Sequence, residues 1–162
     1  MLMNRWKLSR TLVLIPLLAA AQDARKPETP AKVVFVCEHG SAKSVIAAAH
    51  FERLAREEGL LFEVVARGTT PDPEIPAAVR NGLKADGITL GDLKPAAVTS
   101  ADLRGAAKVI SFGPDLSSVN SAKIPVEDWS ATPAVSADYA AARSYIVNQL
   151  QALLEQLKKA SR

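Results

Sequence analysis

The only cysteine of the 162-residue chain, Cys37, begins a short segment that is dense in polar and reactive side chains. It is followed by Glu-His-Gly-Ser-Ala and then by Lys43 and Ser44. A cysteine thiolate is a strong nucleophile, and a positive electrostatic environment favours the thiolate form. Lys43 could neutralise an anionic substrate, and Ser44 could hydrogen-bond to the thiolate. These residue types point to nucleophilic attack on an anionic group.

The flanking sequence predicts a strand that ends at Cys37 and a helix that begins at the end of this segment. Lys32–Cys37 is a continuous apolar run rich in β-branched residues, as is typical of a buried parallel strand. Ser44–Glu58 repeats apolar residues at helical spacing, and Gly59 is a natural stop. The loop would aim backbone N–H groups at one point, and the helix start adds unpaired N–H groups and a partial positive charge. We therefore expect an oxyanion cradle with Cys37 at its base.

Strands and helices continue to alternate along the rest of the chain. The predicted strands are Phe62–Ala66, Ala107–Phe112 and Lys123–Val126, and the predicted helices are Ile75–Ala85 and Ser136–Lys159. Ser136 is the predicted N-cap of the last helix. The alternation predicts an α/β fold: a single three-layer domain, with a four-stranded parallel sheet, helices on both faces and a phosphate loop after the first strand. Ligands of such sheets bind at the carboxyl ends of strands, where Cys37 stands.

The N-terminus has the layout of a secretory signal peptide. Three basic residues and no acidic residue precede the apolar run 11–21, which ends in small residues. The run is shorter than the about 20 residues that span a bilayer. We expect a signal peptide over residues 1–21, a linker over 22–31 and the domain over 32–160. The mature protein would then be periplasmic or secreted, without stable membrane insertion; an uncleaved anchor is the alternative.

The composition excludes several classes of protein. The net charge of +3 belongs to the N-terminal segment, because the other 17 basic residues balance the 17 acidic residues. A nucleic-acid-binding face therefore has no support. One cysteine can form neither a disulfide within the chain nor a multi-cysteine zinc site. The expected partner is an anion that the predicted cradle can bind.

The cysteine segment and its surroundings resemble the low-molecular-weight protein tyrosine phosphatase family, which includes thioredoxin-coupled arsenate reductases. The family motif is a strand, then Cys, five residues, Arg, and Ser or Thr, and this chain reads VVFVC-EHGSA-K-S. The resemblance extends over Lys32–Leu157 and continues through Val65–Pro71, Lys84–Gly91, Thr99–Leu103, Ala106–Gly113 and Val126–Trp129.

The resemblance implies a two-step phosphatase that uses no metal and no cofactor and that takes a phosphate-containing substrate or another oxyanion as its partner. Cys37 would attack phosphorus and form a phosphocysteine, which water then cleaves, and Ser44 would support the thiolate. Lys43 and the loop backbone would bind the phosphoryl oxygens. The loop residues are Glu38, His39, Gly40, Ser41 and Ala42.

The chain departs from the family pattern at three positions. Lys43 replaces the Arg, and an ammonium is a point charge, whereas a guanidinium grips two phosphoryl oxygens at once. Gly40 stands where the family has an Asn that braces the loop. Thr132 precedes a proline where the family has its general acid, an Asp, and a Thr cannot protonate a leaving group. Asp128 and Asp115 are the nearest substitutes, and neither position matches the family's.

Each residue of the segment also has a structural interpretation. Cys37 could be a buried thiol without chemistry, and Lys43 could be a solvated surface residue. Glu38 is expected at the surface, since a carboxylate facing the cradle would oppose anion binding. His39 either faces solvent or contacts substrate and tunes Cys37. Ser41 is expected to contribute chiefly its backbone N–H.

Two bulkier side chains outside the segment, Trp129 and His50, are also considered. Trp129 either lines the substrate pocket, which would suit an aromatic substrate, or caps the core. His50 lies in the first predicted helix beside Phe51 and is expected to be structural.

Three functions are compatible with these residues. The first is an exported phosphatase for phosphotyrosine-like or small aryl phosphate monoesters. General acid catalysis typically contributes about 10²–10⁴-fold, so a phosphatase without its acid should favour substrates with good leaving groups. The second, supported by the three departures, is a degenerate domain that binds an oxyanion or a partner without turnover. The third is arsenate reduction with an external thiol, because the chain lacks the further cysteines of the thioredoxin-coupled enzymes.

Overall fold

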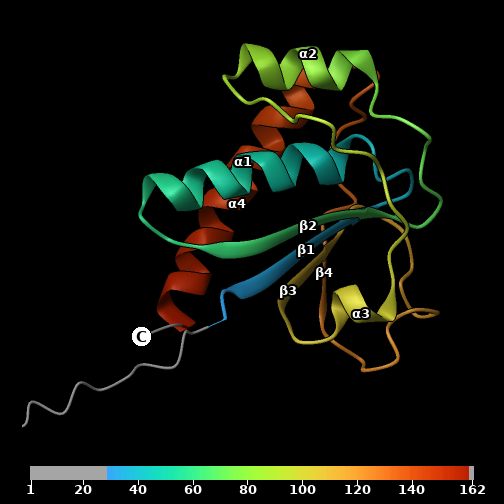
Figure 1. Cartoon of the computed structure of the whole chain (residues 1–162), viewed down its shortest axis with the longest axis vertical. Helices are drawn as coiled ribbons and strands as arrows, with labels where there is room; N and C mark the ends of the chain where they lie inside the picture. The colour runs from blue at the N-terminus through green and yellow to red at the C-terminus, as the bar shows by residue number, and fades with distance from the viewer. Residues whose placement is uncertain (1–28, 161–162) are drawn as a thin grey trace, which may run out of the picture.

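The computed structural model describes residues 29–160, so the predicted signal peptide (1–21) and most of the predicted linker (22–31) lie outside the described residues. Strands and helices alternate along the described chain (Figure 1). The strands are β1 (Ala31–Cys37), β2 (Phe62–Gly68), β3 (Ala106–Ser111) and β4 (Val126–Asp128), and the helices are α1 (Lys43–Glu57), α2 (Ala77–Ala85), α3 (Ser100–Leu103) and α4 (Tyr139–Ala160). None of these helices has the length and apolar character needed to cross a membrane.

The four strands form the predicted parallel sheet, and their order in it is β2-β1-β3-β4. Val33, Val34, Phe35 and Val36 of the central strand β1 are completely buried, because this strand is covered on both faces. The chain leaves β1 toward β2 on one side of the sheet, and it leaves the neighbouring β3 toward β4 on the other side. The carboxyl end of β1, with Cys37, is therefore the point where the strand order reverses and where ligands of open α/β sheets bind.

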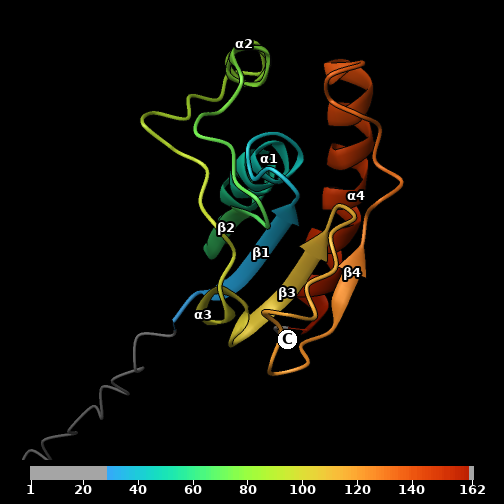
Figure 2. The ribbon, with the colours of Figure 1, turned by 90° about the vertical axis from the view of Figure 1, so that its right-hand side faces the viewer.

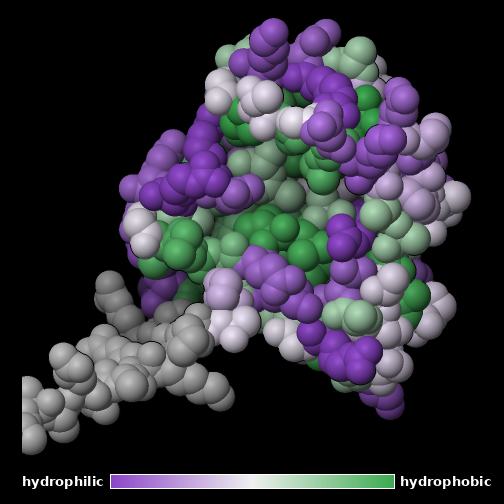
Figure 3. Space-filling view, viewed as in Figure 1, coloured by the Kyte–Doolittle hydropathy of each residue, from purple (hydrophilic) through white to green (hydrophobic). Residues whose placement is uncertain are grey.

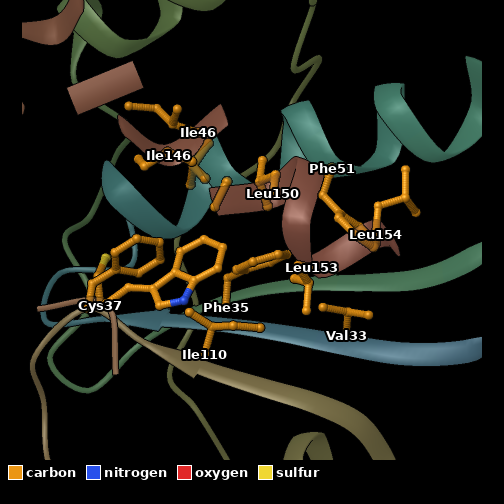
Figure 4. Packing of buried hydrophobic residues seen from close by; sticks show 14 of the residues in the cluster. Val33, Phe35, Cys37, Ile46, Phe51, Ile110, Ile146, Leu150, Leu153 and Leu154 are labelled. Atoms are coloured by element: carbon orange, nitrogen blue, oxygen red, sulfur yellow. The ribbon is translucent and has the colours of Figure 1, made fainter. Parts of the chain in front are cut away.

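Helices cover both faces of the sheet and complete the predicted three layers (Figures 1 and 2). α1 and α4 pack side by side on one face, with α2 beyond them. Their apolar side chains meet Val33, Phe35 and Ile110 of the sheet in the larger core cluster, and Cys37 lies at one end of it (Figure 4). The short α3 and the segment after β3 cover the other face, where Leu103 and Leu116 pack on the remaining side chains of β1 and β3.

α4 begins three residues later than predicted, and Ser136 is not its N-cap. Asp138 is the capping residue: its Oδ1 accepts a hydrogen bond from the backbone N–H of Ala141 at 2.9 Å, and its carbonyl accepts from Ala142. Residues 134–138 form a turn instead, in which the N–H groups of residues 137 and 138 donate to the carbonyl of Ala134. An aspartate two residues downstream thus supplies the first-turn acceptor that the sequence assigned to a serine.

The last strand is also displaced from its predicted position. Lys123 has a φ of +52°, and the side chain of Asn120 binds both the N–H and the carbonyl of Ile124. The chain is therefore still turning where Lys123–Val126 was expected to be extended. Pairing with β3 begins only at Val126, which lies opposite Val109.

A buried polar cluster joins α1, α2 and α4 behind the core. His50 of α1 is 1% exposed, and its Nε2 lies 3.3 Å from Oδ2 of Asp86 at the end of α2. The same oxygen accepts from the hydroxyl of Tyr139 at 3.0 Å. The guanidinium of Arg53 donates to the Asp86 carbonyl and lies 3.2 Å from Nδ1 of His50. These contacts place the buried imidazole in a polar cluster that joins three helices, which is consistent with a structural role.

Candidate active site

Cys37 ends β1 with its side chain almost completely buried, at 6% exposure. Its Sγ shares a hydrogen bond of 3.1 Å with the hydroxyl of Ser44 in the first turn of α1. The backbone N–H of Gly40 donates to the same sulfur at 3.2 Å. Both partners can donate to a thiolate, so the arrangement suits a nucleophilic cysteine better than a thiol packed only among apolar groups.

The loop between β1 and α1 closes tightly against the end of β2. Gly40 has a φ of +60°, and a Cβ atom at this position would lie 2.7 Å from the backbone nitrogen of Gly68. A Cβ atom at Gly68 would lie 2.5 Å from the nitrogen of Gly40. Both the conformation and the contact exclude any side chain from position 40. The Asn of the family motif could not be accommodated at this position, because the backbones of Gly40 and Gly68 touch.

The segment after β2 holds the loop from outside through its backbone. The N–H groups of Thr69, Thr70 and Asp72 donate to the carbonyls of residues 37, 38 and 39 at 3.1, 2.8 and 3.0 Å. A trans peptide is planar, with its C=O and N–H on opposite sides. With these carbonyls turned outward, the N–H groups of residues 38–40 point to the inside of the loop, where Gly40 meets the sulfur. This orientation is the one that the predicted cradle requires.

Asp72 adds a side-chain link to the same loop, and sequence reasoning missed it. The hydroxyl of Ser41, 2% exposed, donates to Oδ2 of Asp72 at 2.6 Å. Oδ1 of Asp72 lies 3.4 Å from Nδ1 of His39, whose other ring nitrogen is 3.9 Å from the carboxylate of Glu38. Ser41 therefore contributes its side chain as well as its backbone. The available signal was a carboxylate just beyond the carboxyl end of the neighbouring strand.

The start of α1 completes the cradle. Ala42 occupies the N-cap position, and no side chain within the described residues caps this helix end. The first N–H groups of α1 are therefore not occupied by a capping side chain, and the helix N-terminus favours an anion. The site would hold its oxyanion between these groups and the loop amides.

Lys43, the predicted replacement for the family's Arg, extends across the site to the segment after β4. Its Nζ donates to the carbonyl of Thr132 at 2.7 Å. No carboxylate lies within 4.0 Å of this ammonium in the described part of the chain. Its positive charge is therefore not neutralised by an acidic side chain and remains available to an anion.

Comparisons with solved structures identify the fold. No family model and no curated protein matches the sequence. YfkJ from Bacillus subtilis superposes with a TM-score of 0.73 at 18% identity, over 85% of this chain and 100% of YfkJ. A low-molecular-weight protein tyrosine phosphatase from Bacillus subtilis gives 0.65 at 20% identity, over 81% and 99%. A thioredoxin-dependent arsenate reductase from Corynebacterium glutamicum gives 0.65 at 22% identity, over 83% and 65%.

This chain has the low-molecular-weight protein tyrosine phosphatase fold. The resemblance of the cysteine segment is thereby matched by the arrangement of the whole domain, with Cys37 at the end of the first strand.

Thr132, which stands where the family has its general acid, is buried. Thr132 is 3% exposed, and its hydroxyl donates to the carbonyl of Trp129 at 2.8 Å. The side chain is thus occupied within its own turn, while its carbonyl faces Lys43.

The two candidate substitute acids each bind a serine in their own turn. Asp128 accepts from the N–H and the hydroxyl of Ser130 at 2.8 and 3.0 Å, and no hydrogen bond among the described residues joins it to Cys37 or Lys43. Hydrogen bonds from Ser117 hold the pKa of Asp115 below its usual value, which disfavours a proton donor. Asp128 remains a prediction as the acid, and it sits outside the set of contacts that converge on the cysteine.

Trp129 lies in the core. It is 3% exposed, its ring packs edge-on against Phe112 and at a tilt against Phe35, and its Nε1 donates to Glu127 at 2.8 Å. Of its two possible placements, the structure has the indole in the core, within the apolar cluster that also contains Cys37. It presents no open aromatic face to a substrate.

An open hollow of about 370 Å³ lies beside the cysteine loop. Its polar lining is Glu38, Thr69, Thr70 and Asp115, and Phe112, Gly113 and Pro114 complete it. A larger hollow of about 650 Å³ lies over α1 and β2, where Figure 3 shows an apolar floor, and none of residues 37–44 lines it. Within residues 29–160, no three His, Cys, Asp or Glu side chains gather as potential ligands of a metal ion.

Proposed function

We propose that the protein is a cysteine-dependent phosphatase that hydrolyses phosphotyrosine-like or small aryl phosphate monoesters. The observation that carries the proposal is the pair of hydrogen bonds at Sγ of Cys37, from Gly40 and with Ser44, at the base of a loop whose N–H groups point inward. A nucleophile stabilised as its thiolate and an adjacent anion cradle are the two requirements of phosphocysteine chemistry.

The reaction would proceed in two displacements. The thiolate of Cys37 attacks phosphorus and forms an S–P bond while the bond to the ester oxygen breaks. The leaving oxygen departs with the electron pair and takes a proton from solvent or from a carboxyl group. Water then attacks phosphorus, releases inorganic phosphate and regenerates the thiolate. The loop amides, the start of α1 and Lys43 would hold the equatorial oxygens throughout, where their fixed dipoles stabilise the developing charge.

The occupied side chain of Thr132 supports a preference for good leaving groups. Without a group that donates a proton to the leaving oxygen, the rate depends on the stability of the departing anion itself. We expect aryl phosphates to be hydrolysed much faster than alkyl phosphates. Asp128→Asn should leave the rate on a good aryl substrate unchanged; a large loss confined to poor leaving groups would identify Asp128 as the acid after all.

A second candidate function is oxyanion binding without turnover. The specific observation in its favour is that Lys43 is held by a backbone carbonyl of the segment that bears the acid in related phosphatases. Arsenate reduction is a third candidate, and it would require an external thiol because the chain contains one cysteine.

We also propose that the protein is exported to the periplasm or beyond the cell. The support is the basic and apolar N-terminal sequence alone. N-terminal sequencing of the protein recovered from its host would test this, since export predicts a mature end near Gln22.

The central test is hydrolysis of a small aryl phosphate by the reduced, purified protein beside its Cys37→Ala variant. Turnover that is absent from the variant, with trapping of a phosphorylated Cys37, supports the phosphatase. A folded, reduced protein with no turnover above the variant, but with Cys37 protected from alkylation by inorganic phosphate, supports the binding domain. Formation of arsenite that depends on added thiol would favour the reductase.

A further inference from the structure

We propose that Asp72 is the positioning residue of the cysteine loop, and that it acts through the hydroxyl of Ser41. The inference rests on the proposed function, since it assigns a brace to the same oxyanion site. Asp72 is 35 positions after Cys37 in the chain, and it contacts the loop that follows Cys37.

The first step is that the loop cannot be braced from within at position 40. The backbone of Gly68 fills the space that a side chain there would need, at 2.7 Å from the site of its Cβ. Any side-chain brace must therefore come from another position.

The second step is that the carboxylate of Asp72 binds a side chain of the loop. Its backbone N–H donates to the carbonyl of His39, and its carboxylate accepts from Ser41 at 2.6 Å. A hydrogen bond to a carboxylate is roughly twice as strong as one between neutral groups. Ser41 is 2% exposed, so loss of this acceptor would leave a buried hydroxyl without its partner.

The third step is that both ends of the contact are stiffened. Asp72 lies between Pro71 and Pro73, whose rings fix φ and restrict the residue before each. The N–H groups of Thr69 and Thr70 are bound to the carbonyls of Cys37 and Glu38. Asp72 thus links a rigid segment to the middle of the cradle, where a small displacement of the amides weakens their grip on a phosphoryl group.

The experiment compares Asp72→Ala, Asp72→Asn, Ser41→Ala and the Ser41→Ala/Asp72→Ala double variant in the full chain. Two quantities are measured: the concentration of inorganic phosphate that protects Cys37 from iodoacetamide, and kcat and KM on an aryl phosphate. Asp72→Ala and Ser41→Ala should each weaken protection and lower kcat by about 10-fold or more, as expected for loss of a hydrogen bond to a charged group. The double variant should be no worse than either single variant, and Asp72→Asn, which keeps an acceptor for Ser41, should stay within about threefold of the parent.

Glu74→Ala is the matched control, because Glu74 is an exposed carboxylate in the same segment with no hydrogen bond or ion pair among the described residues. Phosphate protection that is equal in Asp72→Ala and Glu74→Ala would overturn the proposal. Losses that add in the double variant would also overturn it, because the two residues would then act independently. If Asp72→Ala fails to fold, Ser41→Ala removes the same bond and decides the question.

The two measurements separate this inference from the proposed function. Absence of turnover in the parent, together with phosphate protection that the variants lose, would reject the phosphatase and retain Asp72 as the brace. Turnover that all variants share with the control would retain the phosphatase and reject the brace. If inorganic phosphate does not protect Cys37 of the parent protein at all, both the phosphatase and the brace would be rejected.

Discussion

The ammonium of Lys43 lies 2.7 Å from the carbonyl oxygen of Thr132 and so ties the cysteine loop to the segment after β4. Two departures from the family pattern, a lysine for an arginine and a threonine for an aspartate, therefore meet in one contact. The lysine is held in place by a neutral group, which fixes its position without cancelling its charge.

This contact predicts how substitution of Lys43 affects anion binding. Lys43→Met removes the charge and one hydrogen-bond donor, so we expect phosphate to protect Cys37 about 10-fold to 100-fold less well. Lys43→Arg keeps the charge and should retain phosphate binding. Protection of Cys37 from alkylation over a phosphate titration measures both. Undiminished protection in Lys43→Met would show that the lysine is a surface residue without a part in the site.

The hydrogen bond between Ser44 and Cys37 predicts a slower nucleophile when it is removed. Ser44 is completely buried and has its oxygen 3.1 Å from the sulfur. Ser44→Ala should slow alkylation of Cys37 at neutral pH by about 10-fold, because a hydrogen bond to a charged group contributes about 1.5–3 kcal/mol. The rate of reaction with iodoacetamide across pH measures the effect. Ser121→Ala, at an exposed serine, is the control and should react at the rate of the parent.

The contact between Gly40 and Gly68 predicts that an alanine at position 40 lowers the unfolding free energy more than an alanine at a glycine whose only special feature is a positive φ. Gly59 has a φ of +71° with nothing within 4 Å of its missing Cβ, whereas Gly40 faces the Gly68 backbone at 2.7 Å. Gly59→Ala should cost about 1–2 kcal/mol of unfolding free energy. Gly40→Ala should cost more and should also weaken phosphate binding, because the loop must move. Urea denaturation of both variants tests this, and equal costs would show that the backbones are free to separate.

The buried cluster at His50 predicts a loss of stability on acidification. Burial is the main cause that holds the pKa of His50 below its usual value of 6.5, followed by the nearby charge of Arg53. Asp86 opposes both effects, and Arg143 adds a smaller repulsion. The unfolded chain therefore binds a proton more readily than the folded one as the pH falls through 6.5, which favours unfolding.

The measurement is the unfolding free energy between pH 7.5 and 5 in the parent and in His50→Gln. The decline on acidification should be steeper in the parent, since only the parent has a histidine to protonate at this position. An identical decline in both proteins would contradict this assignment.

The sequence alone determined the central strand, the helix after it and the cysteine between them. Lys32–Cys37 is apolar throughout because both faces of β1 are covered, and this pattern is local and readable. The order of strands and helices then predicted the parallel sheet, and the family resemblance predicted the fold that the solved structures share.

Tertiary structure decided which groups meet at the cysteine. Asp72 reaches Ser41 from 31 residues away, and Thr132 reaches Lys43 from 89 residues away. Neither approach follows from periodicity, because each depends on how the segments after β2 and β4 fold back over the ends of the strands. The need for glycine at position 40 is likewise a tertiary effect, because it comes from the backbone of Gly68, which packs against Gly40. Local patterns thus predicted most of the elements, whereas packing between distant segments determined which groups meet at the site.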